Sequence, residues 1–270
     1  MKRIVIVLVV LVGLLVGADF AAATFAEHTV SQKAREQLGL DQDPAVEIHG
    51  FPFALQAASG EYDHISITAD GVRVQELQDV SVRANLHDVN APMSDLTSGN
   101  ADNIEIGRLV GEITLKASDI ARVAPLTNID DLRIEPSSKS YVLHGEGVDE
   151  ERAAEIDEDG DDSTAGVRLS GKADVAGERI EIFAFAMIEL DGTTIRITPH
   201  RLQFGNDKET TVVPEEVQRA LLPNFEADIN AGTMPFTVTP TAIHVAPGSL
   251  TLHGEAENVT FGGVSDTLGG

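Results

Sequence analysis

The histidines and acidic residues are the side chains of this sequence that could do acid–base or metal chemistry. The eight histidines are scattered along the chain, and none pairs with another at metal-ligand spacing on an evident helix. His144 and His253 share the context L-H-G-E. Such a His–Glu pair could transfer protons, but a polar residue at a strand end would look the same. The chain has no G-x-S-x-G, H-E-x-x-H or Walker motif, and no G-x-G-x-x-G after a strand, so we expect no catalytic site and no cofactor.

The acidic segment 149–165, DEERAAEIDEDGDDSTA, invites comparison with a calcium loop. An EF-hand loop that started at Glu155 would place Asp157, Asp159 and Gly160 correctly, but Gly166 would occupy the position of the bidentate acid. We therefore predict a solvated acidic loop and no metal site. Because the chain has no cysteine, thiol catalysis and cysteine zinc sites are excluded.

The charge balance excludes a class of partner. The chain carries 44 Asp and Glu against 19 Lys and Arg, which gives a net charge of −25. Nucleic acids bind basic surfaces, so we expect no nucleic-acid partner. Docking on an anionic membrane by charge alone is disfavoured for the same reason.

The N-terminus predicts export. Lys2 and Arg3 precede an apolar run over residues 4–18, which Asp19 interrupts before the small residues 21–23. A positive flank, an apolar stretch of about 15 residues and an A-x-A site are typical of a signal peptide. A retained spanning helix would have to tolerate Asp19 near its outer end. We expect a signal peptide or N-terminal anchor over 1–23, a single exported domain over 24–262, and a flexible tail over 263–270.

The spacing of apolar residues, which indicates the helices and strands that must position any site, changes along the chain. Apolar residues recur at four-residue spacing over 24–40, which predicts an amphipathic helix. From residue 65 onward, apolar and polar residues alternate, which indicates antiparallel strands with one buried face. The sequence further predicts hairpin turns at Asp70-Gly71 and Asp191-Gly192, strands over 109–117, 132–134, 141–148, 167–176 and 178–190, a short helix capped by Ser118-Asp119, and a helix from Pro214 to Leu222.

Several stretches resemble the LmeA family of phospholipid-binding proteins, which are envelope proteins of actinobacteria linked to lipomannan elongation. They are GFPF at residues 50–53, the following Gly60 and Tyr62, and ISITADGV at residues 65–72. The likeness extends over most of 24–260, through LKASDIARV, the P-E-E helix and PFTVTPTAIHVAPGSLTLHGEAENV. The acidic segment 149–165 is longer and more charged than we expect for this region in the family.

The resemblance implies an α+β fold like that of tubular lipid-binding proteins. In such a fold a long, curved antiparallel sheet wraps against a few helices and encloses an apolar cavity. It also implies binding of a phospholipid, with phosphoinositide as one class, by a non-catalytic protein of the cell envelope or periplasmic space. Contact with the membrane would be peripheral or through the N-terminal anchor.

The aromatic residues around Pro52 and the strand arginines are candidate binding residues. Proline cannot donate to a strand ladder, so Pro52 is predicted at an edge or bend. The two flanking rings then either plug one end of the core or lie at a cavity mouth, where they contact acyl chains or the membrane. A lipid phosphate would need a cation, and Arg196 and Arg201 are the headgroup candidates. The candidates for the lipid-contacting lining are Phe51, Phe53, Leu55, Ile65, Ile67, Val80, Val82, Phe183, Phe185 and Phe204.

Two other functions stay open at this point. The chain could be a structural or adaptor module that assists an envelope glycosyltransferase by contact, with a filled core and an exposed apolar patch. It could also be an envelope hydrolase that uses some of its histidines.

Overall fold

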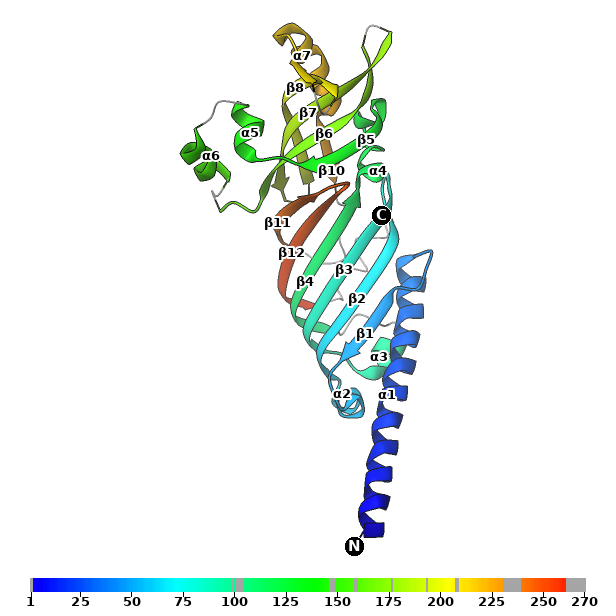
Figure 1. Ribbon diagram of the computed structural model, residues 1–270. Coiled ribbons are helices and arrows are strands. Elements are labelled where there is room, and N and C mark those ends of the chain that lie inside the picture. Colours follow the sequence, from blue (N-terminus) through cyan, green and yellow to red (C-terminus); the bar gives the residue numbers. More distant parts are fainter. Residues whose placement is uncertain are drawn as a thin grey trace.

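The computed structural model of the protein describes residues 2–98, 100, 104–145, 149–157, 160–175, 177–192, 194–206, 209–230 and 239–260. Two antiparallel sheets follow one another along the long axis of the molecule, and one long helix runs beside the first sheet (Figure 1). The expected fold class, α+β with a strongly curved antiparallel sheet, is confirmed.

The first sheet, sheet A, has six strands in the order β1-β2-β3-β4-β12-β11. Alternating apolar residues give it one buried face, which we call the inner face; it carries Ile65, Leu86, Leu109 and Leu252. The strands are β1 (Ala45–His49), β2 (Glu61–Val74), β3 (Leu77–Asn90), β4 (Glu105–Lys116), β11 (Thr239–Ala246) and β12 (Ser249–Thr260); the nearby short helices are α2 (Phe53–Ser59), α3 (Met93–Ser98), α4 (Ala117–Ile120) and η1 (Leu126–Asn128).

The second sheet, sheet B, has the order β10-β8-β7-β6-β5, and β9 also pairs with β8. Every residue from Ile182 to Ile188 in its central strand β7 is buried, because one face meets the core and the other meets α5. The strands are β5 (Asp130–Pro136), β6 (Thr164–Val175), β7 (Glu178–Asp191), β8 (Thr194–Asn206), β9 (Glu209–Val212) and β10 (Ala227–Asn230); the helices are α5 (Lys139–His144), α6 (Glu150–Asp157), α7 (Glu215–Leu221) and η2 (Leu222–Phe225).

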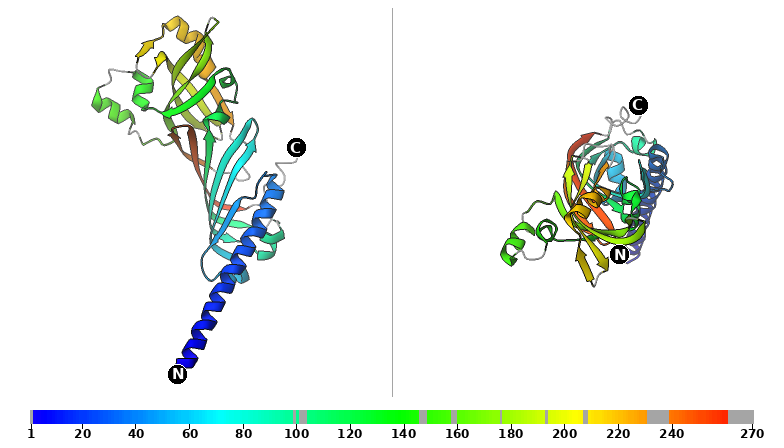
Figure 2. Two further views of the ribbon diagram at one scale, coloured as in Figure 1. Left: turned by 45° about the vertical axis from the view of Figure 1, so that its right-hand side comes forward. Right: turned by 90° about the horizontal axis from the view of Figure 1, so that it is seen from above.

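Helix α1 (Lys2–Leu38) is one continuous helix of 37 residues, or roughly 55 Å. Its first half extends beyond the sheets with exposed apolar side chains, and its second half packs against β1, α2 and α3 (Figure 2). Glu27 Oε1 accepts a hydrogen bond from Ile48 N at 2.8 Å, and Ser31 Oγ donates to Pro44 O at 2.5 Å. The predicted helix over 24–40 is therefore the C-terminal half of a longer helix, and this half is tied to the start of sheet A.

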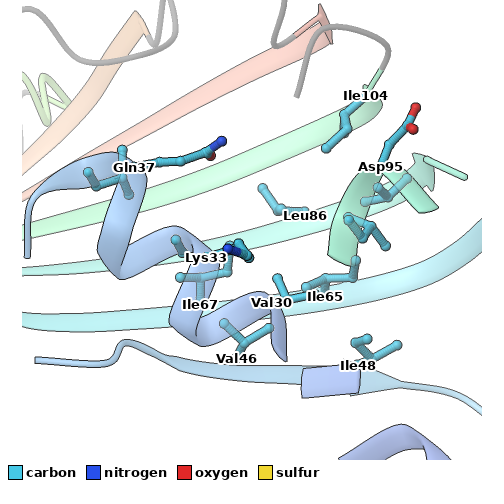
Figure 3. A pocket seen from close by; sticks show the side chains of 14 residues that line it. Val30, Lys33, Gln37, Val46, Ile48, Ile65, Ile67, Leu86, Asp95 and Ile104 are labelled. Carbon is cyan, nitrogen blue, oxygen red and sulfur yellow. The ribbon is translucent and has the colours of Figure 1, made fainter. Parts of the chain in front are cut away.

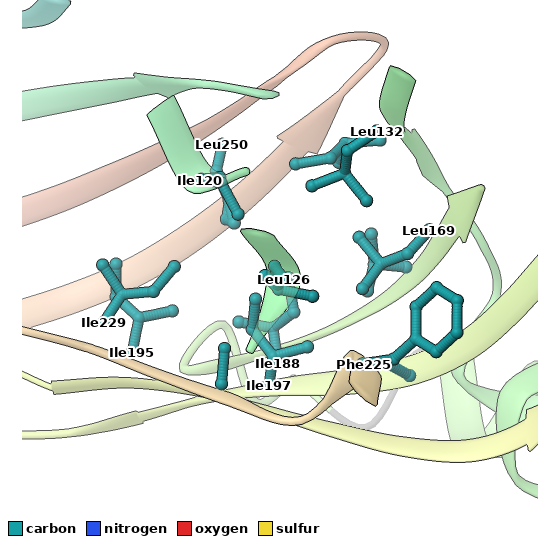
Figure 4. Close-up of a cluster of buried hydrophobic side chains, with 14 of the residues drawn as sticks. Ile120, Leu126, Leu132, Leu169, Ile188, Ile195, Ile197, Phe225, Ile229 and Leu250 are labelled. Carbon is teal, nitrogen blue, oxygen red and sulfur yellow. The ribbon is translucent and has the colours of Figure 1, made fainter. Parts of the chain in front are cut away.

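Two hydrophobic cores lie along the molecule. The proximal core surrounds the second half of α1 and includes Ala26, Phe53, Tyr62, Ile65 and Leu86. The distal core joins the far end of sheet A to the concave side of sheet B, and side chains from both sheets interlock there (Figure 4). Its members include Ile120, Leu126, Leu132, Leu169, Ile188, Ile195, Ile197, Phe225, Ile229 and Leu250.

Several local predictions are confirmed. A hairpin turn follows Asp191, a helix follows Pro214, and strand β4 covers the predicted strand over 109–117 except for its last residue. The segment around Pro52 is a bend between β1 and α2, as its proline predicts.

Other local predictions are wrong. Asp70-Gly71 is a bulge inside β2, where the pairing register shifts, and the hairpin turns at Gln75 and Glu76. The predicted strand over 141–148 is replaced over its described residues by the end of α5. The acidic segment 149–165 contains helix α6 and the start of β6 rather than a continuous loop. Residue 159 of the EF-hand comparison and the tail 263–270 lie outside the described residues.

Candidate functional site

An apolar pocket lies between the second half of α1 and the inner face of sheet A. Figure 3 shows the side chains that line it, and its cavity volume is about 140 Å³. Helix α1 covers one side, β1, β2 and β3 form the floor, and α3 lies at the far end. The lining residues are Val30, Lys33, Ala34, Gln37, Leu38, Val46, Ile48, Ile65, Ile67, Leu86, Val89, Asp95, Leu96 and Ile104.

The floor of the pocket follows from strand periodicity and register. Val46 lies opposite Ile67, and Ile48 lies opposite Ile65, which in turn lies opposite Leu86. Partners in register project to the same face of a sheet, so these five aliphatic side chains form one continuous surface. Val30 and Ala34 face it from α1, because residues four apart share one face of a helix.

Polar groups stand only at the edge of this otherwise aliphatic lining, within the described part of the chain. Lys33 Nζ donates to Glu36 Oε2 at 2.8 Å. This hydrogen bond, helped by the charge attraction, lowers the pKa of the Glu36 carboxyl from its ordinary value of 4.5. Asp95 and Gln37 also border the pocket. The arrangement suits a hydrocarbon chain inside the pocket and a polar group beside Lys33.

A row of small residues continues the inner face beyond the pocket. Ala84 of β3 pairs with Gly111 of β4, and Gly111 pairs with Gly254 of β12. A Cβ added at Gly111 would make only ordinary van der Waals contacts, at 3.6 Å or more. The inner face therefore carries only small residues along this row, which leads from the proximal core toward the distal core.

The predicted lining residues fall in separate places. Ile65 and Ile67 line the pocket, and Phe53 is 5% exposed in the proximal core. Phe51 and Leu55 are 59% and 67% exposed, beyond the pocket. The remaining predicted residues lie elsewhere: Val80, Val82 and Phe204 belong to or border the distal core, and Phe183 and Phe185 lie on the outer face of sheet B beside α5.

The two headgroup candidates are not at the pocket. Arg196 pairs with Asp191 at 3.2 Å and with Asp228 at 3.3 Å. The Arg201 guanidinium lies 4.3 Å from the ring centre of Tyr141 and 4.9 Å from that of Phe185. Both arginines belong to sheet B, and neither lines the pocket under α1.

A second pocket, of about 410 Å³, lies on the outer face of sheet B. Rings and polar groups line it together, and Arg168 is paired there with Glu135. This mixed lining does not resemble a hydrocarbon site. Its lining residues are Pro136, Ser137, Tyr141, Arg168, Phe183, Phe185 and Gln203.

The histidines with a shared sequence context are not brought together. His144 ends α5 beside sheet B, and His253 lies on β12 of sheet A, 3.7 Å from Glu112 Oε1. Among the described residues, no three His, Asp or Glu side chains are placed to hold one metal ion.

Sequence reasoning missed Lys33 as the cation beside the pocket. A signal was present, because Lys33 lies between Val30 and Ala34 on the apolar stripe of the predicted helix. The sequence had predicted Arg196 and Arg201 instead, but both lie on β8 of sheet B, away from the pocket.

Comparison with known proteins identifies the family. No curated protein and no solved structure matched the chain. The family model described as LmeA-like phospholipid-binding matches residues 17–255, which include both the pocket and the helix that covers it. The chain therefore belongs to the LmeA-like phospholipid-binding family.

Proposed function

We propose that the protein binds a phospholipid with an acyl chain in the pocket under α1 and the phosphate beside Lys33. The observation that carries this proposal is the continuous aliphatic floor formed by β1, β2 and β3, with a cation at its edge. Family membership supplies the ligand class. The proposed role is binding and carrying, without a catalytic step.

The energetics allow reversible loading. Burying one CH₂ group gains about 0.8 kcal/mol relative to water. A bilayer offers nearly the same gain, so the exchange of an acyl chain between membrane and an aliphatic pocket is close to neutral. A carrier needs this balance, because a lipid held too tightly would not be released.

The size of the pocket indicates how much lipid it encloses. Its volume of about 140 Å³ is below the roughly 300–1,000 Å³ of sites that enclose a drug-sized molecule. The pocket thus holds part of one acyl chain in this conformation. The remainder of the lipid extends toward the edge beside Lys33 or along the row of small residues at Gly111.

The cellular setting is also part of the proposal. The positive N-terminal flank and the apolar first half of α1 support export to the cell envelope. There the protein would supply or hold phospholipid, with phosphoinositide as one candidate class, during lipoglycan synthesis. Contact with a glycosyltransferase as an adaptor is the alternative role.

Native mass spectrometry of the full chain tests the proposal. The wild type, mixed with vesicles of phosphatidylinositol and phosphatidylcholine and then separated from them, should carry a phospholipid mass. Ala34→Phe, which places a ring in the pocket, should carry several-fold less. Gln32→Phe adds the same ring to the exposed face of α1 and should load like the wild type.

Two results would overturn the proposal. One is a wild type that acquires no phospholipid mass. The other is an Ala34→Phe variant that unfolds at the wild-type temperature and loads as fully as the wild type. An adaptor without a lipid site predicts the first of these results.

A further inference from the structure

Asp19 of α1 caps the N-terminus of α2. Its Oδ2 accepts a hydrogen bond from Phe53 N, and its Oδ1 accepts one from Ala54 N, each at 2.8 Å. The first backbone N–H groups of a helix have no partner within the helix, and Pro52 at the N-cap position offers no side-chain acceptor. A carboxylate 34 residues earlier in the chain fills this role.

Neighbouring residues join the same two helices. The rings of Phe20 and Phe51 are stacked with centroids 6.1 Å apart. Ala23 and Ala26 pack with Phe53 in the proximal core. The match to the family model begins at residue 17, so it includes these contacts. Cleavage after residue 23 would remove the cap and the Phe20 ring from a folded domain that is built around them.

The apolar side chains at this junction are exposed. Phe20, Phe51 and Leu55 are 62%, 59% and 67% exposed, and we call these three residues the anchor tip. Phe20 belongs to α1, Leu55 belongs to α2 and Phe51 precedes α2. Figure 1 shows α2 beside α1, at the end of the molecule that carries the N-terminal half of the helix. An amphipathic edge of Phe and Leu is suited to the boundary between headgroups and acyl chains.

A membrane span counted along α1 would end near this tip. Helix α1 is long and apolar enough over Ile4–Leu38 to cross a membrane, by length and composition. A hydrocarbon core requires about 20 residues, which counted from Ile4 ends at about Ala23. A charged side chain within such a span is costly. The Asp19 carboxylate is not left bare, however, because it accepts two backbone hydrogen bonds from α2.

We propose that α1 is retained as a membrane anchor and that the anchor tip is seated in the bilayer leaflet on the side of the folded domain. Asp19 holds α2 against the anchor, so that Phe51 and Leu55 enter the leaflet together with Phe20. The partner of this surface is the lipid bilayer, and the contact is apolar, since the chain carries a net charge of −25. Val30, at the pocket, then stands roughly 15 Å above Phe20 along the helix.

This inference extends the proposed function and rests on it, because it takes the pocket to be the phospholipid site. A carrier fixed in this way receives lipid from the leaflet beneath it. Its pocket faces the same bilayer at every cycle, and loading needs no encounter by diffusion.

Tryptophan fluorescence in vesicles tests the placement, because the chain contains no Trp of its own. The full chain is reconstituted in phosphatidylcholine vesicles with bromine on the acyl chains. The fluorescence of Phe51→Trp and of Leu55→Trp should each be several-fold lower in brominated vesicles than in unbrominated vesicles. The control is Leu143→Trp, an exposed position on α5 beside sheet B, which should be quenched little.

Equal, weak quenching of all three probes would overturn the inference. The N-terminal mass of the protein from its native membrane is a second, independent test: a chain that includes Asp19 is expected, and a chain that begins after residue 23 contradicts retention. The phospholipid mass carried by the protein after its separation from the vesicles distinguishes the two proposals. Lipid without quenching at Phe51→Trp leaves the proposed function standing and rules out the membrane contact of the anchor tip, whereas quenching without bound lipid does the reverse.

Discussion

Asp119 Oδ2 accepts a hydrogen bond from Asp79 N at 2.7 Å, and this contact ties helix α4 to the start of β3. Oδ1 of the same carboxylate lies 3.2 Å from Gln78 N and 3.4 Å from Arg122 Nε. Asp119 is 1% exposed, so these partners replace the water that a carboxylate would otherwise need. The residue therefore fixes the far end of the β2–β3 hairpin to the distal core.

Replacing Asp119 should destabilise the fold. Asp119→Ala removes the acceptor of two backbone N–H groups, and we expect a loss of about 2–3 kcal/mol in the free energy of unfolding. Urea unfolding followed by circular dichroism measures this loss. Asp63→Ala, an equal charge change at an exposed residue of β2, should cost under about 0.5 kcal/mol. Equal stabilities of the two variants would contradict this account of Asp119.

Tyr62 should be replaceable by phenylalanine without loss. Its side chain is 1% exposed, and its hydroxyl has no hydrogen-bond partner within the described part of the chain. Tyr62→Phe keeps the ring and removes an unsatisfied polar group, so stability should be unchanged or higher by about 1 kcal/mol. A variant less stable than the wild type by more than about 1 kcal/mol would show that the hydroxyl has a partner.

The same substitution should alter the response to alkaline pH. Burial raises the pKa of Tyr62 above its ordinary value of 10.0. Above pH 10 the unfolded chain releases this proton before the folded chain does, so the unfolded state binds fewer protons and stability falls as pH rises. Tyr62→Phe should lose this part of the decline between pH 9 and 11 in urea titrations. Parallel curves for the two proteins would contradict the shift.

The sequence predicted the strands and their buried faces better than the turns and caps at which strands and helices end. Alternation along residues 80–86 predicted β3 and its buried face, because burial on one side imposes a period of two. Asp70-Gly71 misled for a physical reason: a glycine at positive φ serves a bulge as well as a hairpin turn, and only pairing with β3 decides between them. The Ser118-Asp119 cap failed similarly, since the Asp119 carboxylate binds residues about 40 positions earlier.

The site was partly predictable. Ile65 and Ile67 were predicted because period-two alternation marks a buried face. Phe183 and Phe185 have the same alternation, but their face of β7 is covered by α5, a helix in a segment whose pattern predicted a strand. Which of two apolar faces borders the pocket depends on the packing of α1, α5 and the two sheets, which strand periodicity does not encode.

Lys33 should govern the preference for anionic lipid. Lys33→Gln keeps much of the stem that borders the pocket and removes the charge, so binding of phosphatidylinositol should weaken about 2–5-fold, the effect of a partly exposed charge contact. Affinity of the wild type should also fall with added salt more steeply than that of the variant. Lys172→Gln, on sheet B, makes the same change in net charge and should bind like the wild type. A vesicle competition assay that ranks both variants equally would refute a phosphate contact at Lys33.

Loss of the Asp19 carboxylate should loosen α2 from the anchor. Asp19→Ala leaves Phe53 N and Ala54 N without their acceptors, and the cost should be about 1 kcal/mol, as for other helix N-caps. The effect should be local, because the core contacts of Phe53 remain. Hydrogen exchange of the full chain, read on a peptide over 51–59, should therefore be several-fold faster, with peptides of β7 unchanged. Asp41→Ala, at an exposed residue beyond the end of α1, is the matched control and should leave the 51–59 peptide at its wild-type rate. Wild-type exchange over 51–59 in Asp19→Ala would mean that α2 keeps its place without the cap, and the link between anchor and tip would then have to come from the Phe20–Phe51 stack alone.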